Sequence, residues 1–265
     1  MFQQILILQN KVKLKKTLIR LAVLLFWLGV WQGVFMLVNQ EILIVSPLQV
    51  IERIFELVIT ADFWKNVGFS FLRIIGGYML GIVIAVIFAC LMSISEVADE
   101  LLYPVVSLAK STPVASFIIL ALVWLKKDYV PLFIVFLIVL PVVCGSLKTA
   151  ISETDKVLVE TAKIYKFSFF KTVKTVYLGS VLPSFVSSSV TALGLAWKSG
   201  VAAEVIAMPL KSIGYNLYRS KINIETKDLF AWTAIVIILS VLLEKLIKII
   251  LLKLSGVRYD KNHLS

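Results

Sequence analysis

Histidine is almost absent from this chain of 265 residues, whose only example is His263 in a polar C-terminal stretch. A histidine-based metal site or acid–base site therefore has almost no material, and we expect neither a metal site nor a catalytic site in this chain. Cysteine is nearly as scarce, because only Cys90 and Cys144 occur and both lie within apolar runs. They are expected to pack against neighbouring side chains rather than to form a disulfide.

A phosphate-binding loop is also missing, since no glycine-rich stretch ends in Lys followed by Ser or Thr. The chain is therefore not expected to be an enzyme that hydrolyses ATP. Acidic residues are in short supply as well, because 27 Lys and Arg stand against 16 Asp and Glu, for a net charge of +11. Such an excess can indicate nucleic-acid binding, but its distribution along the chain favours membrane orientation instead.

Apolar residues make up 60% of the chain, and the mean hydropathy of +0.96 is far too high for a soluble domain. A helix that crosses about 30 Å of hydrocarbon needs about 20 such residues. The sequence predicts an all-α membrane protein with six transmembrane helices. The six predicted spans are 17–38, 67–92, a third span that ends at 124, 129–146, 180–208 and 229–252.

Three segments follow from this division. Residues 1–16 form an N-terminal segment that ends in several lysines, residues 17–254 form the transmembrane domain, and residues 255–265 form a polar C-terminal tail. A signal peptide is the competing interpretation of the N-terminus. It is disfavoured because the apolar run from Thr17 to Val38 is too long and lacks a small-residue cleavage site.

The positions of Lys and Arg give the orientation. If the N-terminus is inside, the cytoplasmic side receives twice as many Lys and Arg residues as the outer side. We therefore predict a multi-pass protein of the bacterial inner membrane with both termini in the cytoplasm.

Local signals add detail to the predicted spans and connections. Ser46-Pro47 is a typical helix start and indicates a surface helix on the outer side. Gly77 and Gly81 have the spacing that lets two helices approach closely. Pro113 is expected to break the third span, because irregular backbone at membrane depth must line protein or a cavity.

The most informative stretch runs from Val157 to Ile206. It opens with apolar residues at roughly helical spacing and lysines between them, which indicates a short amphipathic helix that leads into the fifth span. Such a helix could bind lipid headgroups, or it could lay its apolar face in a groove on a soluble partner.

Glu160-Thr161-Ala162, then Lys166, then residues 176–183 (VYLGSVLP) resemble the "EAA" signature of ABC importer permeases. In that family the segment is a cytoplasmic coupling loop, here about residues 150–176 between spans 4 and 5, that docks on an ATP-binding subunit. Lys166 stands at the glycine of the motif, and lysine reaches left-handed dihedrals only at a cost, so the sequence does not fix this turn. The residues expected to contact the ATP-binding subunit are Glu160, Thr161, Ala162, Tyr165, Lys166, Phe169 and Phe170.

Two further stretches, 70–78 (SFLRIIGGY) and 196–204 (AWKSGVAAE), resemble the nitrate, sulfonate, taurine and bicarbonate branch of these permeases. The resemblance implies a type I importer fold and a second permease chain, as a homodimer or a heterodimer. It also implies two ATP-binding subunits, which would hold ATP and Mg²⁺, and an extracytoplasmic solute-binding protein. No cofactor is expected on this chain itself.

Charged residues at membrane depth are costly and are candidates for the solute pathway, in this chain Arg73, Lys110, Lys198 and Glu204. Arg73 could instead extend to the membrane interface, and Glu204 could serve in structural pairing. The three basic residues favour a small anion such as a sulfonate, nitrate or bicarbonate, while a vitamin precursor remains the alternative within the same class. Outside this class, an ion-coupled secondary transporter and a membrane-embedded enzyme remain the rival functions.

Overall fold

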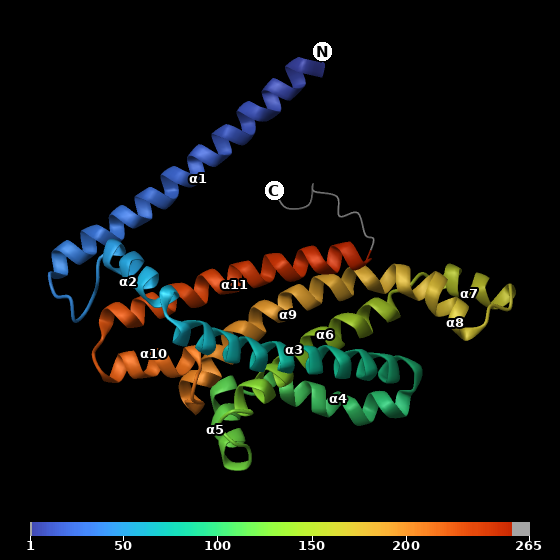
Figure 1. Ribbon diagram of the computed structural model, residues 1–265. Coiled ribbons are helices and arrows are strands. Elements are labelled where there is room, and N and C mark those ends of the chain that lie inside the picture. Colours follow the sequence, from blue (N-terminus) through green and yellow to red (C-terminus); the bar gives the residue numbers. More distant parts are fainter. Residues whose placement is uncertain (1, 256–265) are drawn as a thin grey trace.

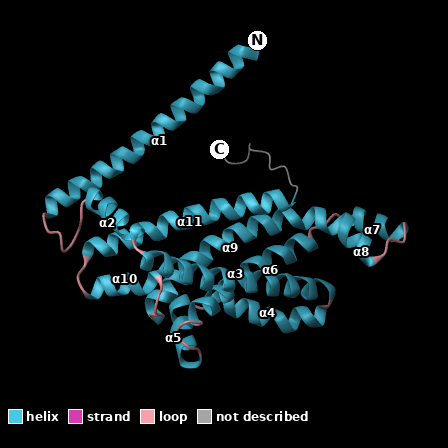
Figure 2. Ribbon diagram, in the orientation of Figure 1, coloured by secondary structure: helices cyan, strands magenta, loops and turns pink. Residues whose placement is uncertain are grey.

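The computed structural model describes residues 2–255, with side chains described for residues 15–251 and 253. Within this range every regular element is a helix, as the sequence predicted (Figure 2). The helices, in chain order, are α1 (Phe2–Val38), α2 (Pro47–Ile59), α3 (Ala61–Ile94), α4 (Glu96–Ser111), α5 (Val114–Trp124), α6 (Val130–Ser152), α7 (Lys156–Ile164), α8 (Phe169–Thr172), the π-helical turn η1 (Val173–Tyr177), α9 (Leu178–Ala207), α10 (Ile213–Ile222) and α11 (Thr226–Ser255).

Helix α2 begins where the sequence predicted it. The Ser46 hydroxyl accepts a hydrogen bond from the Gln49 amide at 3.2 Å, and the Gln49 side chain accepts one from the Ser46 amide at 2.9 Å. This reciprocal pair is a capping box, with Pro47 at the first helical position. The helix start is therefore set by residues adjacent in sequence.

The core lies where α3, α6 and α9 pack against one another. A Cβ atom added at Gly77 would clash with the carbonyl oxygen of Leu132, and one added at Gly81 would lie 2.7 Å from the Cβ of Val139. Both neighbours belong to α6, so the predicted close approach at this glycine pair is confirmed. On the other side of α9, the buried Trp197 donates to the Val236 carbonyl of α11 at 3.0 Å.

Four helical stretches of the described chain are long and apolar enough to cross a membrane. They are Lys15–Val38, Ala61–Ile94, Val130–Ser152 and Phe169–Ala207. Helices α4 and α5 together form a fifth candidate that is bent by 110° at the break between them. This break falls at Thr112-Pro113, as predicted. The number of spans is therefore four or five by length and composition, and α11 occupies the place of the predicted sixth.

Helix α1 projects away from the other helices (Figure 1). It begins at Phe2 and continues through the predicted first span, and none of that span is buried inside the chain. Its attachment is at Trp31, whose indole N–H donates to the Val45 carbonyl at 3.0 Å and whose ring stacks on Phe230 at 6.0 Å.

The remaining helices form an elongated bundle with two different ends (Figure 1). We call the end that carries α7 and α8 the loop end, and the end that carries α10 and the 125–129 turn the clamp end. Helices α8, η1 and α9 follow one another without a break from Phe169 to Ala207, so the fifth span begins earlier than predicted. One helical path thus runs from the loop end to the clamp end.

Candidate functional site

At the loop end, α7 starts and stops through local hydrogen bonds. The Asp155 carboxylate accepts from the Val157 amide at 2.8 Å and caps the first turn. At the other end, the Lys166 amide donates to the Lys163 carbonyl at 3.0 Å, and the Phe167 amide donates to the Ala162 carbonyl at 2.9 Å. These two bonds form a Schellman motif, the helix ending that usually has glycine at its left-handed position.

Lys166 occupies that left-handed position, with φ of 51°. The glycine-type turn is therefore retained without the glycine, which answers the question that the sequence left open. A non-glycine residue in this conformation costs about 1–2 kcal/mol. Because the chain breaks here, the single amphipathic helix expected from the sequence is divided into α7 and the α8–η1 segment.

Apolar and aromatic side chains are exposed on both sides of this break. We call them the loop surface, which comprises Val157, Leu158, Ile164, Tyr165, Phe169 and Phe170. Tyr165 is 71% exposed and Phe170 83% exposed. Glu160 is exposed as well, and Ala162 is the one buried residue of α7. The Lys171 ammonium lies 3.9 Å from the centre of the Phe167 ring, which keeps positive charge next to the aromatic groups.

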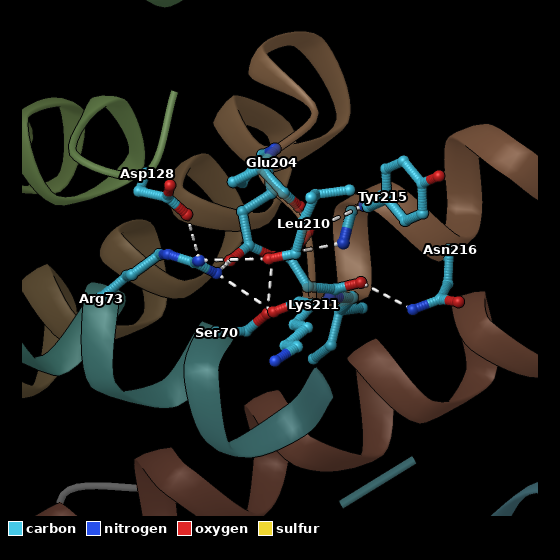
Figure 3. A network of polar contacts seen from close by, with 12 residues as sticks. Ser70, Arg73, Asp128, Glu204, Leu210, Lys211, Tyr215 and Asn216 are labelled. Atoms are coloured by element: carbon cyan, nitrogen blue, oxygen red, sulfur yellow. Dashed lines mark hydrogen bonds and ion pairs between the residues drawn. The ribbon is translucent and has the colours of Figure 1, made fainter. Parts of the chain in front are cut away.

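At the clamp end, Glu204 of α9 is completely buried, and α3 and α10 contact it (Figure 3). Its Oε2 accepts from the Ser70 hydroxyl at 2.7 Å and from the Gly214 amide at 3.2 Å. Its Oε1 forms an ion pair with Nη1 of Arg73 at 3.6 Å. A buried carboxylate needs such partners, because burial of an uncompensated charge costs several kcal/mol.

Arg73 makes three further polar contacts (Figure 3). It donates to the carbonyls of Leu210 and Lys211, both at 3.2 Å, and it forms an ion pair with Asp128 of the 125–129 turn. Its side chain is 13% exposed, whereas that of Asp128 is 60% exposed. Arg73 therefore joins α3, the 125–129 turn and the 208–212 loop. We call Ser70, Arg73, Asp128 and Glu204 the Arg73 clamp.

The 208–212 loop is shaped to bring α10 close to Glu204. Met208 and Lys211 both have left-handed φ angles, of 51° and 54°. The Ser212 hydroxyl then caps α10 by accepting from the Tyr215 amide at 3.0 Å. Gly214 has no room for a side chain, because a Cβ there would clash with the Cβ of Glu204. The glycine permits the amide–carboxylate contact.

A second arginine lies further out at the same end. Arg53 of α2 binds Asp228 of α11 through two hydrogen bonds, the Nη2–Oδ2 bond being 3.0 Å, and it also binds Glu56. The hydrogen bonds to Asp228 and then to Glu56 raise the pKa of Arg53 above its usual value. Nearby, a hydrogen bond from Gln49 and then the charge of Lys227 lower the pKa of Glu41. These pairs fasten α2 to the start of α11.

Residues 77–255 match the family model described as "binding-protein-dependent transport system inner membrane component". The chain belongs to this family. The permease resembles a "probable ABC transporter permease protein" of Brucella melitensis, with 25% identity over 86% of this chain and 93% of the relative.

Two further relatives carry solute names. A Bacillus subtilis protein provisionally named an aliphatic sulfonates transport permease is 23% identical over 86% of this chain and 83% of its own. The taurine transport system permease of Escherichia coli is 22% identical over 75% of this chain and 74% of its own. These matches confirm that the chain is an ABC transporter permease and agree with the branch that the sequence resembled. They also support a multi-pass inner-membrane protein.

The two lysines predicted for the solute pathway lie apart from the Arg73 clamp. Lys110 is exposed in the last turn of α4, directly before the bend into α5. Lys198 is exposed on α9, next to the buried Trp197. Neither makes a hydrogen bond or an ion pair within the described part of the permease. The structure brings together Arg73 and Glu204 from the predicted set, and their role in the pathway stays a prediction.

Three polar residues that contact other helices were not among the residues predicted from the sequence. Ser70 and Asp128 complete the Arg73 clamp, and only Ser70 lay in a stretch that the family resemblance had marked. Glu244 of α11 is the third. Its carboxylate packs against Gly194 of α9, where an added Cβ would lie 2.5 Å from it. Within the described residues no cluster of three or more His, Cys, Asp or Glu side chains is arranged to hold a metal ion.

Proposed function

We propose that this permease has six transmembrane helices and forms the membrane pathway of an ATP-driven importer for a small anion. The family match and the ABC permease relatives support the class. The four or five apolar spans, with α11 as the sixth, support the architecture. ATP and Mg²⁺ would be bound by a partner, since the sequence has no phosphate-binding loop of its own.

The observation that carries the proposal is the loop surface. The aromatic side chains of Tyr165, Phe169 and Phe170 are exposed, and so is Glu160 of the preceding helix α7. Large apolar groups of this kind are typical of surfaces that bind a partner, and aromatic residues often dominate the binding energy. The partner proposed here is the ATP-binding subunit, in two copies, because these residues lie in the stretch that resembles the coupling signature.

The connection from the loop surface to the bundle suggests how the two would be coupled. Phe169 and Phe170 begin the helical path that continues through η1 and α9 to Ala207. That path contains Glu204, so a displacement imposed at the loop end would reach the clamp end through one helix. Transport would then follow from rigid-body shifts of packed helices between two states.

The orientation and the partners follow from the same proposal. The loop end lies in the cytoplasm together with both termini, in agreement with the excess of Lys and Arg on that side. The clamp end then faces outward, where an extracytoplasmic solute-binding protein delivers the solute. A second copy of this chain, as a homodimer, completes the pathway.

The small anion is supported by two observations. The printed names of relatives include transport of aliphatic sulfonates, taurine and bicarbonate. In the permease itself, Lys110 and Lys198 are exposed cations without a partner in the described chain. Arg73 adds less to this support, because its guanidinium already binds two carboxylates and two carbonyls.

The test is to purify the tagged chain from its native membranes, identify the subunits that remain bound, and reconstitute the complex in liposomes. We expect an ATP-binding subunit to be recovered and ATP-dependent uptake of labelled taurine or bicarbonate in the presence of the recovered binding protein. Recovery of the chain alone, together with ion-driven uptake that needs no ATP, would contradict the proposal and favour a secondary transporter.

A further inference from the structure

The Arg73 clamp has a buried half and an exposed half. In the buried half, Glu204 binds Ser70, Arg73 and the Gly214 amide and has no exposed surface. In the exposed half, Arg73 binds Asp128, whose side chain is 60% exposed. Figure 3 shows that the two carboxylates approach the guanidinium from different elements, Glu204 from α9 and Asp128 from the turn before α6.

The carboxylates of Glu204 and Asp128 differ in how much the fold depends on their contact with Arg73. Glu204 is completely buried and pairs with Arg73, so without Arg73 its carboxylate would be buried and uncompensated. Asp128 is a second carboxylate on a guanidinium that is already paired. Release of Asp128 would leave it in water, where an exposed ion pair contributes little. The exposed half is therefore the part of the clamp that can open at low cost.

Arg73 contacts residues from both sides of a groove at the clamp end. This groove, of about 610 Å³, is lined on one side by Lys126, Lys127 and Asp128 and on the other by Met208, Pro209, Leu210 and Tyr215. Arg73 holds both sides, since it binds Asp128 of the first and the Leu210 carbonyl of the second. Loss of the Asp128 contact would release the exposed residues 126–129 from the 208–212 loop, while Leu125 and Val130 on either side stay packed against the cluster that contains Ala203 of α9.

We propose that the 125–129 turn is a gate at the clamp end. The contact between Asp128 and Arg73 is released when the gate opens, whereas the Arg73–Glu204 pair does not move. In the closed state Arg73 holds the 125–129 turn against the 208–212 loop. In the open state residues 126–129 move away from the 208–212 loop, whereas Val130 at the start of α6 stays buried and the Arg73–Glu204 pair persists. Arg73 and Glu204 are then positioning residues rather than binding residues for the solute. The role of this gate in transport rests on the proposed function, but its existence does not.

The test measures the width of the groove in the full-length chain in lipid nanodiscs, together with any subunits that copurify. Spin labels are attached at Lys127→Cys and Leu210→Cys, in a Cys90→Ser background that leaves the buried Cys144 in place. Asp128→Ala is compared with Asp128→Glu, which restores the carboxylate, and with Asp62→Ala. The last is a matched control, because Asp62 is also an exposed carboxylate paired with a cation, in this case Lys65 of the same helix.

We expect Asp128→Ala to raise the ratio of wide to narrow label distances by up to about five-fold, as for the loss of an exposed ion pair. Asp128→Glu should return the distribution toward that of the parent, and Asp62→Ala should leave it unchanged. An unchanged distribution in Asp128→Ala, or an equal change in Asp62→Ala, would overturn the proposal.

Hydrogen exchange separates the two halves of the clamp. The amides of Ile213 and Gly214 donate to Ser70 and Glu204 in the buried half. They should remain as protected in Asp128→Ala as in the parent chain, and faster exchange there would overturn the division into a fixed and a releasable half. Absence of ATP-driven uptake by the parent complex would contradict the proposed function, whereas an unchanged label distance would contradict the gate alone.

Discussion

The two ends of the bundle differ in whether charged and aromatic side chains are covered by partners within the chain. At the clamp end, a buried carboxylate and a guanidinium find their partners within the chain, from α3, α9, α10 and the 125–129 turn. At the loop end, the rings of Phe169 and Phe170 contact each other edge to face with their centres 5.8 Å apart, but 66% and 83% of their surfaces remain exposed.

The difference shows which end leaves apolar surface uncovered within the chain itself. An exposed charge is stable in water, and a buried charge is stable once it is paired, but a cluster of exposed aromatic groups loses the hydrophobic stabilisation that burial would give. The clamp end is thus complete as a folded unit. At the loop end, the loop surface remains exposed in the chain alone, and we propose that the ATP-binding subunit covers it.

Removal of the Glu204 carboxylate tests the completeness of the clamp end and should have the largest effect. Glu204→Ala leaves Arg73, the Ser70 hydroxyl and the Gly214 amide without their buried partner, so we expect a loss of about 3–5 kcal/mol in unfolding free energy. Denaturation in detergent measures it. Glu56→Ala, which breaks an exposed pair of Arg53, should cost less than about 1 kcal/mol. Equal losses in both variants would contradict the structural role of Glu204.

Filling the space at Gly214 tests the same end through its packing. Gly214→Ala places a methyl group against the Cβ of Glu204, and we expect a cost of about 1–3 kcal/mol and faster amide exchange in α10. Gly68→Ala is the control, because a Cβ there meets no atom within 4 Å and alanine favours a helix. Greater stability of Gly214→Ala than of the parent chain would show that α10 does not approach Glu204 as described.

The turn at Lys166 offers a test at the loop end, where the expected change in local stability is smaller. Lys166→Gly relieves the left-handed strain, so the local stability of the α7 ending should rise by about 1 kcal/mol. Lys163→Gly, within α7 itself, should lower it by about as much. Hydrogen exchange of the Phe167 amide, which closes the Schellman motif, reports both changes. Slower exchange in Lys163→Gly than in Lys166→Gly would contradict this assignment.

Local features of the fold were predictable from the sequence. The cap at Ser46-Pro47, the break at Pro113 and the close packing at Gly77 and Gly81 each depend on neighbouring residues or on one helix face. The Lys166 turn was only partly predictable, because the sequence shows the missing glycine but not whether lysine accepts its conformation.

The contacts of the clamp were not predictable in the same way. Ser70 and Glu204 are separated by 134 residues, and Arg73 and Asp128 by 55. Membrane depth marked Arg73 and Glu204 as costly charges, but only the packing of α3 against α9 makes them partners. In the sequence, nothing distinguished Asp128 from an ordinary charged residue of a polar turn. Its contact with Arg73 depends on where the fold places the 125–129 turn.

The most direct test of the account is whether the loop surface binds an ATP-binding subunit. The tagged chain is purified as the parent, as Phe169→Ala/Phe170→Ala and as Phe55→Ala, a control in α2 with the same 66% exposure as Phe169. Recovery of the ATP-binding subunit is then measured for each. The account predicts full recovery with the parent and with Phe55→Ala, and at least about a ten-fold loss with the double variant, as for the loss of aromatic anchors. Equal recovery with all three would contradict it.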